Sequence, residues 1–235
     1  MNYACSNDIP RNSLSYTLGS LQHRTGDAAS ARATLYDSAE VAAAAGDDWQ
    51  VANVWVALVD VVGKGLARFE EAEALARVAA VAIARLGGNP ALSSRLANAR
   101  GRNLLAEGRG VEALRAYEIA LALDEDVRGT DHPLVAVTLA NAAEVELALG
   151  RPALARMRLD RAVAILIGAG KRGPTLARSW HLVGRAFLSE SRFLEASRAL
   201  ESARVIFARY ADRAADLAAV ESALASCKQA SPSGG

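Results

Sequence analysis

The 235-residue sequence predicts an all-α protein, a right-handed superhelical solenoid of about five helix-turn-helix repeats with a C-terminal capping helix. One observation is an alanine that returns every 41 or 42 residues, at Ala31, Ala72, Ala113, Ala155 and Ala196. A second is a small residue five positions before each alanine, at Gly26, Ala67, Gly108, Gly150 and Ser191. Small residues at fixed points of a long period mark places where backbones approach closely, as they do in stacked repeats.

Composition supports helices over strands. Hydrophobic residues make up 51% of the chain but aromatic residues only 5%, so the core must consist mainly of Ala, Leu and Val. Alanine and leucine are strong helix formers, and alanine lets helices pack closely. A chain of this length can bury a continuous core.

Each repeat is predicted to contain two helices. In the third repeat the first helix runs from about Pro90 to Glu107, Gly108 makes the turn, and the second helix runs from about Val111 to Val127. Local signals agree with this register. Asp27, Asn89 and Asp131 stand where an N-cap is needed. Prolines fall at helix starts, where a missing N–H costs nothing: Pro90, Pro133, Pro152 and Pro174.

The expected organisation is an N-terminal tail, five repeats, a capping helix and a disordered tail, at residues 1–10, 11–46, 47–88, 89–130, 131–172, 173–210, 211–228 and 229–235. The second repeat has one extra residue between Leu58 and Ala72, so we expect a distorted turn near residues 63–65. Ala67 and Ser191 replace the glycine found in the equivalent turns, and we expect those two turns to be less tight.

Several classes of function receive no support from composition. The net charge of +1 gives no general attraction to nucleic acid. No apolar run is long enough to span a bilayer, and the first ten residues lack the layout of a signal peptide. Cys5 and Cys227 lie near opposite ends of the sequence, so reduced thiols are expected. We therefore expect a cytoplasmic location.

The repeat positions resemble the tetratricopeptide repeat. Trp55 and Trp180 match its first conserved aromatic position, and the small residue four positions later is present in four repeats, as Gly19, Gly101, Ala143 and Gly184. The long period is similar to that of the kinesin-light-chain type. The stretch 129–136, GTDHPLVA, resembles a motif of that subtype, and 68–72, RFEEA, resembles its second-helix start. This resemblance implies a protein-binding fold.

The residue pattern of 61–88 also resembles the C-terminal repeat region of large bacterial serine/threonine kinases and multidomain transcription regulators. The kinase sequence signatures themselves do not occur in this chain. This second resemblance implies a regulatory domain, or a free-standing relative of one.

The concave groove of such a solenoid is lined by the first helices of the repeats. Side-chain amides in this groove could pair a peptide backbone, and arginines could bind its acidic groups. We expect an extended, acidic peptide or partner segment to bind Arg95, Asn98, Arg102, Asn141, Glu144, Arg178, His181 and Arg185. The alternative for each arginine is an ordinary solvated position in an Arg-rich protein.

No catalytic, cofactor or metal site is predicted, because the three histidines are far apart and no nucleophile–base pair emerges. His132 is expected to cap a helix, His23 to lie on the surface, and Trp49 to be an exposed aromatic residue. Two alternatives to a peptide-binding scaffold remain open. One is a regulatory sensor domain that binds a peptide or small ligand. The other is self-assembly into a homodimer through an N-terminal face near Leu14, Leu18 and Leu21.

Overall fold

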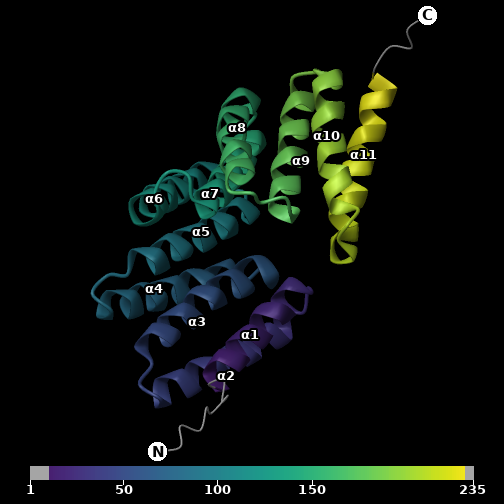
Figure 1. Cartoon of the computed structure of the whole chain (residues 1–235). Coiled ribbons are helices and arrows are strands. Elements are labelled where there is room, and N and C mark those ends of the chain that lie inside the picture. The colour runs from purple at the N-terminus through teal and green to yellow at the C-terminus, as the bar shows by residue number, and fades with distance from the viewer. Residues whose placement is uncertain (1–10, 231–235) are drawn as a thin grey trace, which may run out of the picture. The chain divides into compact units, whose positions relative to one another are not determined.

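The computed structural model describes residues 11–230, with side chains from residue 14 onward. This part of the chain contains eleven α-helices and no strand (Figure 1). The helices are α1 (Arg11–Arg24), α2 (Ala28–Ala44), α3 (Asp48–Asp60), α4 (Phe69–Arg85), α5 (Pro90–Ala106), α6 (Gly110–Arg128), α7 (Pro133–Ala148), α8 (Pro152–Gly168), α9 (Pro174–Ser189), α10 (Phe193–Phe207) and α11 (Ala214–Ala230). A π turn occupies Val61–Gly65 and a 3₁₀ turn Ala211–Arg213.

Two parts of the sequence prediction lie outside the described residues. They are the expected N-terminal tail at residues 1–10, which contains Cys5, and residues 231–235 of the expected C-terminal tail. Within residues 11–230, no helix combines the length and the apolar character that a bilayer crossing requires.

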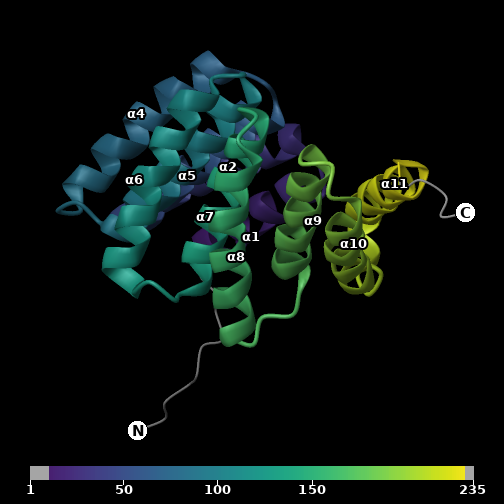
Figure 2. The same cartoon turned by 90° about the horizontal axis from the view of Figure 1, so that it is seen from above.

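The helices form two units, one with α1–α5 that ends at Arg109 and one with α6–α11 that begins at Gly110. In the first unit α1 packs on α2 and α3 on α4, and in the second unit α7 packs on α8 and α9 on α10. Helix α11 packs on α10, as the capping helix was predicted to do, and the three helices α9, α10 and α11 lie side by side in both views (Figures 1 and 2). The all-α, paired-helix prediction is therefore confirmed.

The recurring alanines are buried, as the repeat pattern predicted. Ala31, Ala72, Ala113, Ala155 and Ala196 are all almost completely inaccessible. Gly19 on α1 and Gly184 on α9 serve the same purpose: an added Cβ would come within 2.8 Å of Leu35 and 2.5 Å of Leu200, respectively. Small residues at these positions let the two helices of a pair approach, and the leucines fill the space above them.

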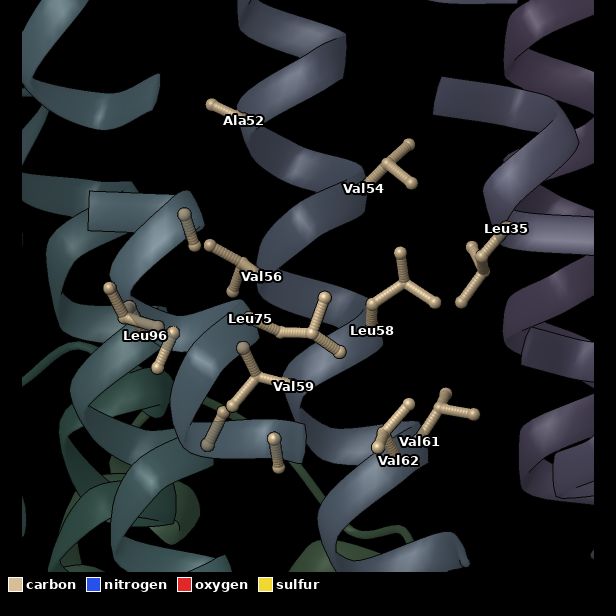
Figure 3. Close-up of a cluster of buried hydrophobic side chains, with 14 of the residues drawn as sticks. Leu35, Ala52, Val54, Val56, Leu58, Val59, Val61, Val62, Leu75 and Leu96 are labelled. Atoms are coloured by element: carbon tan, nitrogen blue, oxygen red, sulfur yellow. The ribbon is translucent and has the colours of Figure 1, made fainter. Parts of the chain in front are cut away.

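The core of the first unit is built from aliphatic side chains of α2 to α5 and the π turn (Figure 3). Leu35 of α2, Leu58 of α3 and Leu75 of α4 lie close to one another, with Val61 and Val62 of the π turn beside them. Trp55 is partly buried against this cluster, as its repeat position predicted. In the second unit Trp180 packs in the same manner, whereas Trp49 is exposed as expected.

The extra residue of the second repeat is accommodated by the π turn that follows α3 at Val61–Gly65. A π turn contains one residue more than an α turn, so it absorbs an insertion without shifting the flanking helices out of register. The distortion expected near residues 63–65 is thus confirmed. The same extra residue lengthens the turn into α4, where the Arg68 amide donates to the Val62 carbonyl oxygen, six residues back.

The turn at Ser191 is not looser than the glycine turns, so the expectation for Ser191 was wrong, whereas the turn at Ala67 is one residue wider, as expected. Both residues adopt the left-handed conformation, with φ of 55° and 58°, as Gly150 does with φ of 72°. In the Ser191 turn the next amide closes the same bond as in the Gly150 turn: Arg192 N–H donates to Phe187 O at 2.9 Å, and Arg151 N–H to Glu146 O at 2.8 Å. The packing of the flanking helices therefore holds these residues in the left-handed conformation, which is strained for a residue with a Cβ atom.

Candidate functional site

The predicted site residues lie on the first helices of the pairs, and they fall in both units. Arg95, Asn98 and Arg102 are on α5 in the first unit, Asn141 and Glu144 are on α7, and Arg178, His181 and Arg185 are on α9. In each unit two arginines are spaced seven residues apart on one helix, which is about two turns, so they project from the same face. The two units are described separately.

In the first unit Arg95 connects three successive first helices. Its guanidinium donates to the Asn53 side-chain oxygen on α3 and to the Tyr16 hydroxyl on α1, the latter at 2.9 Å. The Asn53 amide in turn donates to Gln50 Oε1 at 3.4 Å. Arg95 is thus held in place by polar partners in its own chain.

Two turns further along α5, Arg102 enters a second polar cluster. Its Nε donates to Asp60 Oδ1 at 2.7 Å, and the other oxygen of Asp60 lies 3.3 Å from His23 Nε2 on α1. Burial alone would raise the pKa of Asp60, but the hydrogen bond with His23 and the charge of Arg102 outweigh that effect and hold the pKa well below its usual range. Asp60 is therefore a carboxylate at neutral pH.

Two further amides lie on these helices. Asn98 is half-buried and donates to the Ser94 carbonyl oxygen at 3.2 Å. Gln50 is only 7% exposed, and its Nε2 has no hydrogen-bond acceptor among the described residues. A buried amide that lacks an acceptor is costly, so the first unit has an unsatisfied donor beside Asn53.

In the second unit Glu144 lies between the two arginines of α9. Its Oε2 accepts a bond from Arg178 at 2.5 Å, and its Oε1 lies 3.9 Å from the Arg185 guanidinium. The Arg185 distance is too long for a hydrogen bond, so this pair is purely electrostatic. Arg185 is also the more exposed of the two arginines.

His181 lies between the same two arginines on α9. Burial lowers its pKa, and the charge of Arg185 lowers it further, whereas Asp216 of α11 and Glu144 of α7 act in the opposite direction. The result is a histidine that stays neutral at neutral pH. Asn141 on α7 is only 6% exposed, so it is far less accessible than the residues of α9.

The charges at one repeat position alternate along the sequence. Asp60, Arg102, Glu144 and Arg185 follow one another at intervals of 41 or 42 residues. Asp60 pairs with Arg102 in the first unit, and Glu144 pairs with Arg185 in the second. In the second unit Glu144 thus lies beside two arginines, Arg178 and Arg185, whereas in the first unit Asp60 is paired with Arg102 alone of the two arginines of α5.

The sequence interpretation missed the partners of the first-unit arginines, which are Tyr16, Asn53 and Asp60, and the contact of Asp60 with His23. The prediction of a surface position for His23 was wrong, because its ring is half-buried and bonded to Asp60. The alternating signs at one repeat position were the signal that could have revealed the pairing. The prediction for His132 is confirmed: its Nδ1 accepts a bond from the Leu134 amide at 3.2 Å and caps α7. The prediction of an N-cap at Asp131 was wrong, because the next residue, His132, takes that place.

Among residues 11–230, the His, Cys, Asp and Glu side chains form no group of three or more that could hold a metal ion.

Comparison with known proteins agrees with this architecture. Residues 92–168 match the family model described as tetratricopeptide repeat. No curated protein matches the chain in sequence.

Three solved structures are similar to the chain. BtubC (BKLC) from P. vanneervenii is 20% identical, with a TM-score of 0.73 over 85% of this chain and 82% of that one. The Podosopora anserina putative kinesin light chain with nearly identical TPR-like repeats is 20% identical, with a TM-score of 0.61 over 87% and 99%. Pseudomonas aeruginosa pilF is 18% identical, with a TM-score of 0.57 over 95% and 93%. Residues 92–168 thus match the tetratricopeptide repeat family, and the fold of the chain is similar to that of the kinesin-light-chain TPR-like repeats.

Proposed function

We propose that the chain is a non-catalytic scaffold that binds an extended, acidic peptide segment of a partner protein on the first-helix faces. One observation carries the proposal: in the second unit Arg178 and Arg185, seven residues apart on α9, both lie beside the single carboxylate of Glu144. The excess positive charge lies among half-buried polar side chains, where water screens it less than on an open surface.

Arg185 is the residue best suited to contact an acidic group of the peptide. Its guanidinium is exposed and lies 3.9 Å from Glu144, so this pairing leaves its hydrogen-bonding capacity for a ligand. A planar guanidinium can bind a carboxylate through two parallel hydrogen bonds, which adds orientation to attraction. Arg178, already bonded to Glu144 at 2.5 Å, would position that carboxylate away from the incoming ligand.

The test is selection of a phage-displayed peptide library on the intact chain, followed by affinity measurement with a selected peptide. We expect enrichment of Asp and Glu, and a loss of at least about tenfold in affinity for Arg185→Glu. The matched control is Arg209→Glu, which makes the same change of charge at an exposed position after α10. Arg185→Gln removes the cation without placing a second carboxylate beside Glu144, and circular dichroism checks that each variant is folded.

Two outcomes would contradict the proposal. One is a library selection that enriches no acidic peptide. The other is an equal loss of affinity for the Arg185 and Arg209 variants, because the loss would then come from the change in net charge and not from a contact of Arg185.

A further inference from the structure

A pocket of about 390 Å³ lies in the first unit between α4 and α5, which pack on each other (Figure 1). Helix α4 lines it with Glu70, Glu73 and Arg77, which are spaced at helical intervals on one face, and α5 contributes Arg100 and Asn103. The volume falls within the range of about 300–1,000 Å³ that is typical of small-molecule sites.

Asn103 gives the pocket an unsatisfied hydrogen-bond acceptor. The residue is only 8% exposed, and its Nδ2 donates to the Val59 carbonyl oxygen at 2.8 Å. This bond fixes which end of the side-chain amide is the nitrogen, because a carbonyl oxygen cannot donate. The other end, Oδ1, is buried and has no hydrogen-bond donor among the described residues. A buried acceptor without a donor is costly, so this oxygen favours a ligand that carries an N–H group.

The charges that line the pocket leave one carboxylate and one guanidinium uncommitted. Four of the charged residues form two ion pairs, at 2.8 Å and 3.0 Å: Arg100 with Glu73, and Arg109 with Glu107. The remaining two, Glu70 and Arg77, are exposed and have no ion pair or hydrogen bond with any part of the chain that the structure describes. A ligand that satisfies both must itself carry a cation and an anion.

The ion pair between the helices shows which of these groups lie at the same level. Helices α4 and α5 follow each other through a short connection and pack together, so they run antiparallel. The Arg100 guanidinium meets Glu73, and one turn further along each helix Glu70 therefore lies at the level of Asn103. The unpaired carboxylate and the unsatisfied amide oxygen thus share one end of the pocket, which suits an ammonium group.

The spacing along α4 defines the length of the ligand. Arg77 lies two turns from Glu70, about 10 Å along the helix axis, so the two charges of the ligand must be several bonds apart. The charges of an α-amino acid are too close together to reach both. The half-buried side chains of Phe69 and Leu104 also line the pocket, and they offer an apolar surface to a chain of methylene groups.

We propose that this pocket binds a small zwitterion of the ω-amino acid class. Its carboxylate is bound by Arg77, and its terminal ammonium is bound by Glu70 and by Oδ1 of Asn103. The pocket uses a different face of α5 from that of Arg95 and Arg102, so the proposal is independent of the peptide binding proposed above.

The test is isothermal titration calorimetry of the intact chain with ε-aminocaproate as the probe. Caproate lacks the ammonium, hexylamine lacks the carboxylate, and free glycine has both charges but too short a separation. We expect ε-aminocaproate to bind and each of the other three compounds to bind at least about tenfold more weakly, because each loses a charge-assisted contact.

Variants of the two unpaired residues locate the site. Glu70→Gln and Arg77→Gln should each lower the affinity for ε-aminocaproate by at least about tenfold. The matched controls Glu40→Gln and Arg85→Gln remove the same charges at exposed positions outside the pocket and should leave the affinity unchanged. The NMR signals of the Asn103 side-chain amide should also shift on binding, which tests its contact without a substitution in the core.

Three results would overturn the proposal. The first is no saturable binding of ε-aminocaproate to the parent chain. The second is equal binding of caproate or hexylamine, since a single charge would then suffice. The third is an equal loss of affinity in the pocket variants and in the control variants, which would place the ligand elsewhere. Equal binding of glycine would overturn the ω-amino acid class.

Discussion

Gly63 in the π turn lies directly against the side chain of Asn103 on α5. A Cβ built on Gly63 would lie 2.1 Å from Asn103 Nδ2, closer than any real contact. The same Nδ2 donates to the Val59 carbonyl oxygen at 2.8 Å, in the helical turn just before the π turn. The irregular backbone of the second repeat is thus held by a buried amide of the third.

Gly63→Ala should destabilise the first unit by about 1–3 kcal/mol. The new methyl group would displace the Asn103 amide and break its bond to Val59. Thermal or urea unfolding, followed by fluorescence of Trp49 and Trp55, measures the change. Gly168→Ala is the control, because no atom lies within 4 Å of a Cβ at that helical position. Equal effects of the two variants would contradict the explanation.

Ala67→Gly and Ser191→Gly should each stabilise the protein by about 0.5–1 kcal/mol, since they relieve a side chain in the left-handed region. The gain is partly offset by the greater freedom of glycine in the unfolded chain. The reverse change, Gly150→Ala, should destabilise by about 1 kcal/mol. Denaturant midpoints measure all three, and a loss of stability in both glycine variants would show that the turns are unstrained.

The Asp60 cluster predicts a loss of stability in acid. Its pKa is lowered in the folded chain, from an unfolded value of 3.8, so its contribution is present above about pH 4 and is lost as the pH falls further. Asp60→Asn should cost about 1–3 kcal/mol at pH 7 and should flatten the acid limb of the stability curve. Asp126→Asn, at an exposed position of α6, is the control and should leave that limb unchanged.

His181 predicts a second dependence on pH. Its pKa is lowered below 6.5 in the folded chain, so the unfolded chain binds a proton more readily. Its contribution to stability is therefore complete above the unfolded value and decreases as the pH falls through 6.5 toward the folded value. Subtracting the stability profile of His181→Gln from that of the parent between pH 5 and 8, the range in which histidine changes charge, isolates this contribution. A difference that is constant with pH would contradict the assignment.

The fold was predictable because its determinants are local or periodic. The buried alanines follow from a fixed interval, and the caps at Asp27 and Asn89 follow from the residue types that bond free amides, at 3.0 Å and 3.1 Å here. The insertion before Ala72 predicted an irregular turn. The close contact of this turn with Asn103, 40 residues away from Gly63, is tertiary and has no local signature.

The helix face that carries the site residues was predictable from the sequence, but the hydrogen-bond and ion-pair partners of its arginines were not. Helical spacing placed Arg178, His181 and Arg185 on one side of α9. Whether an arginine is exposed to a ligand or bonded to a neighbour depends on rotamers and on distances of a few ångströms between helices. Arg102 belongs to the bonded kind and Arg185 to the more open kind, although the two occupy the same position in the repeat.

The alternation of Asp60, Arg102, Glu144 and Arg185 limits how such a chain can grow or shrink by recombination. Removal of one repeat would bring carboxylate beside carboxylate, or guanidinium beside guanidinium, at the joint between neighbouring first helices. Removal of two adjacent repeats would restore an opposite pair. A variant that lacks two adjacent internal repeats, about 83 residues, is therefore expected to keep opposite charges at this position, whereas one that lacks a single internal repeat is not.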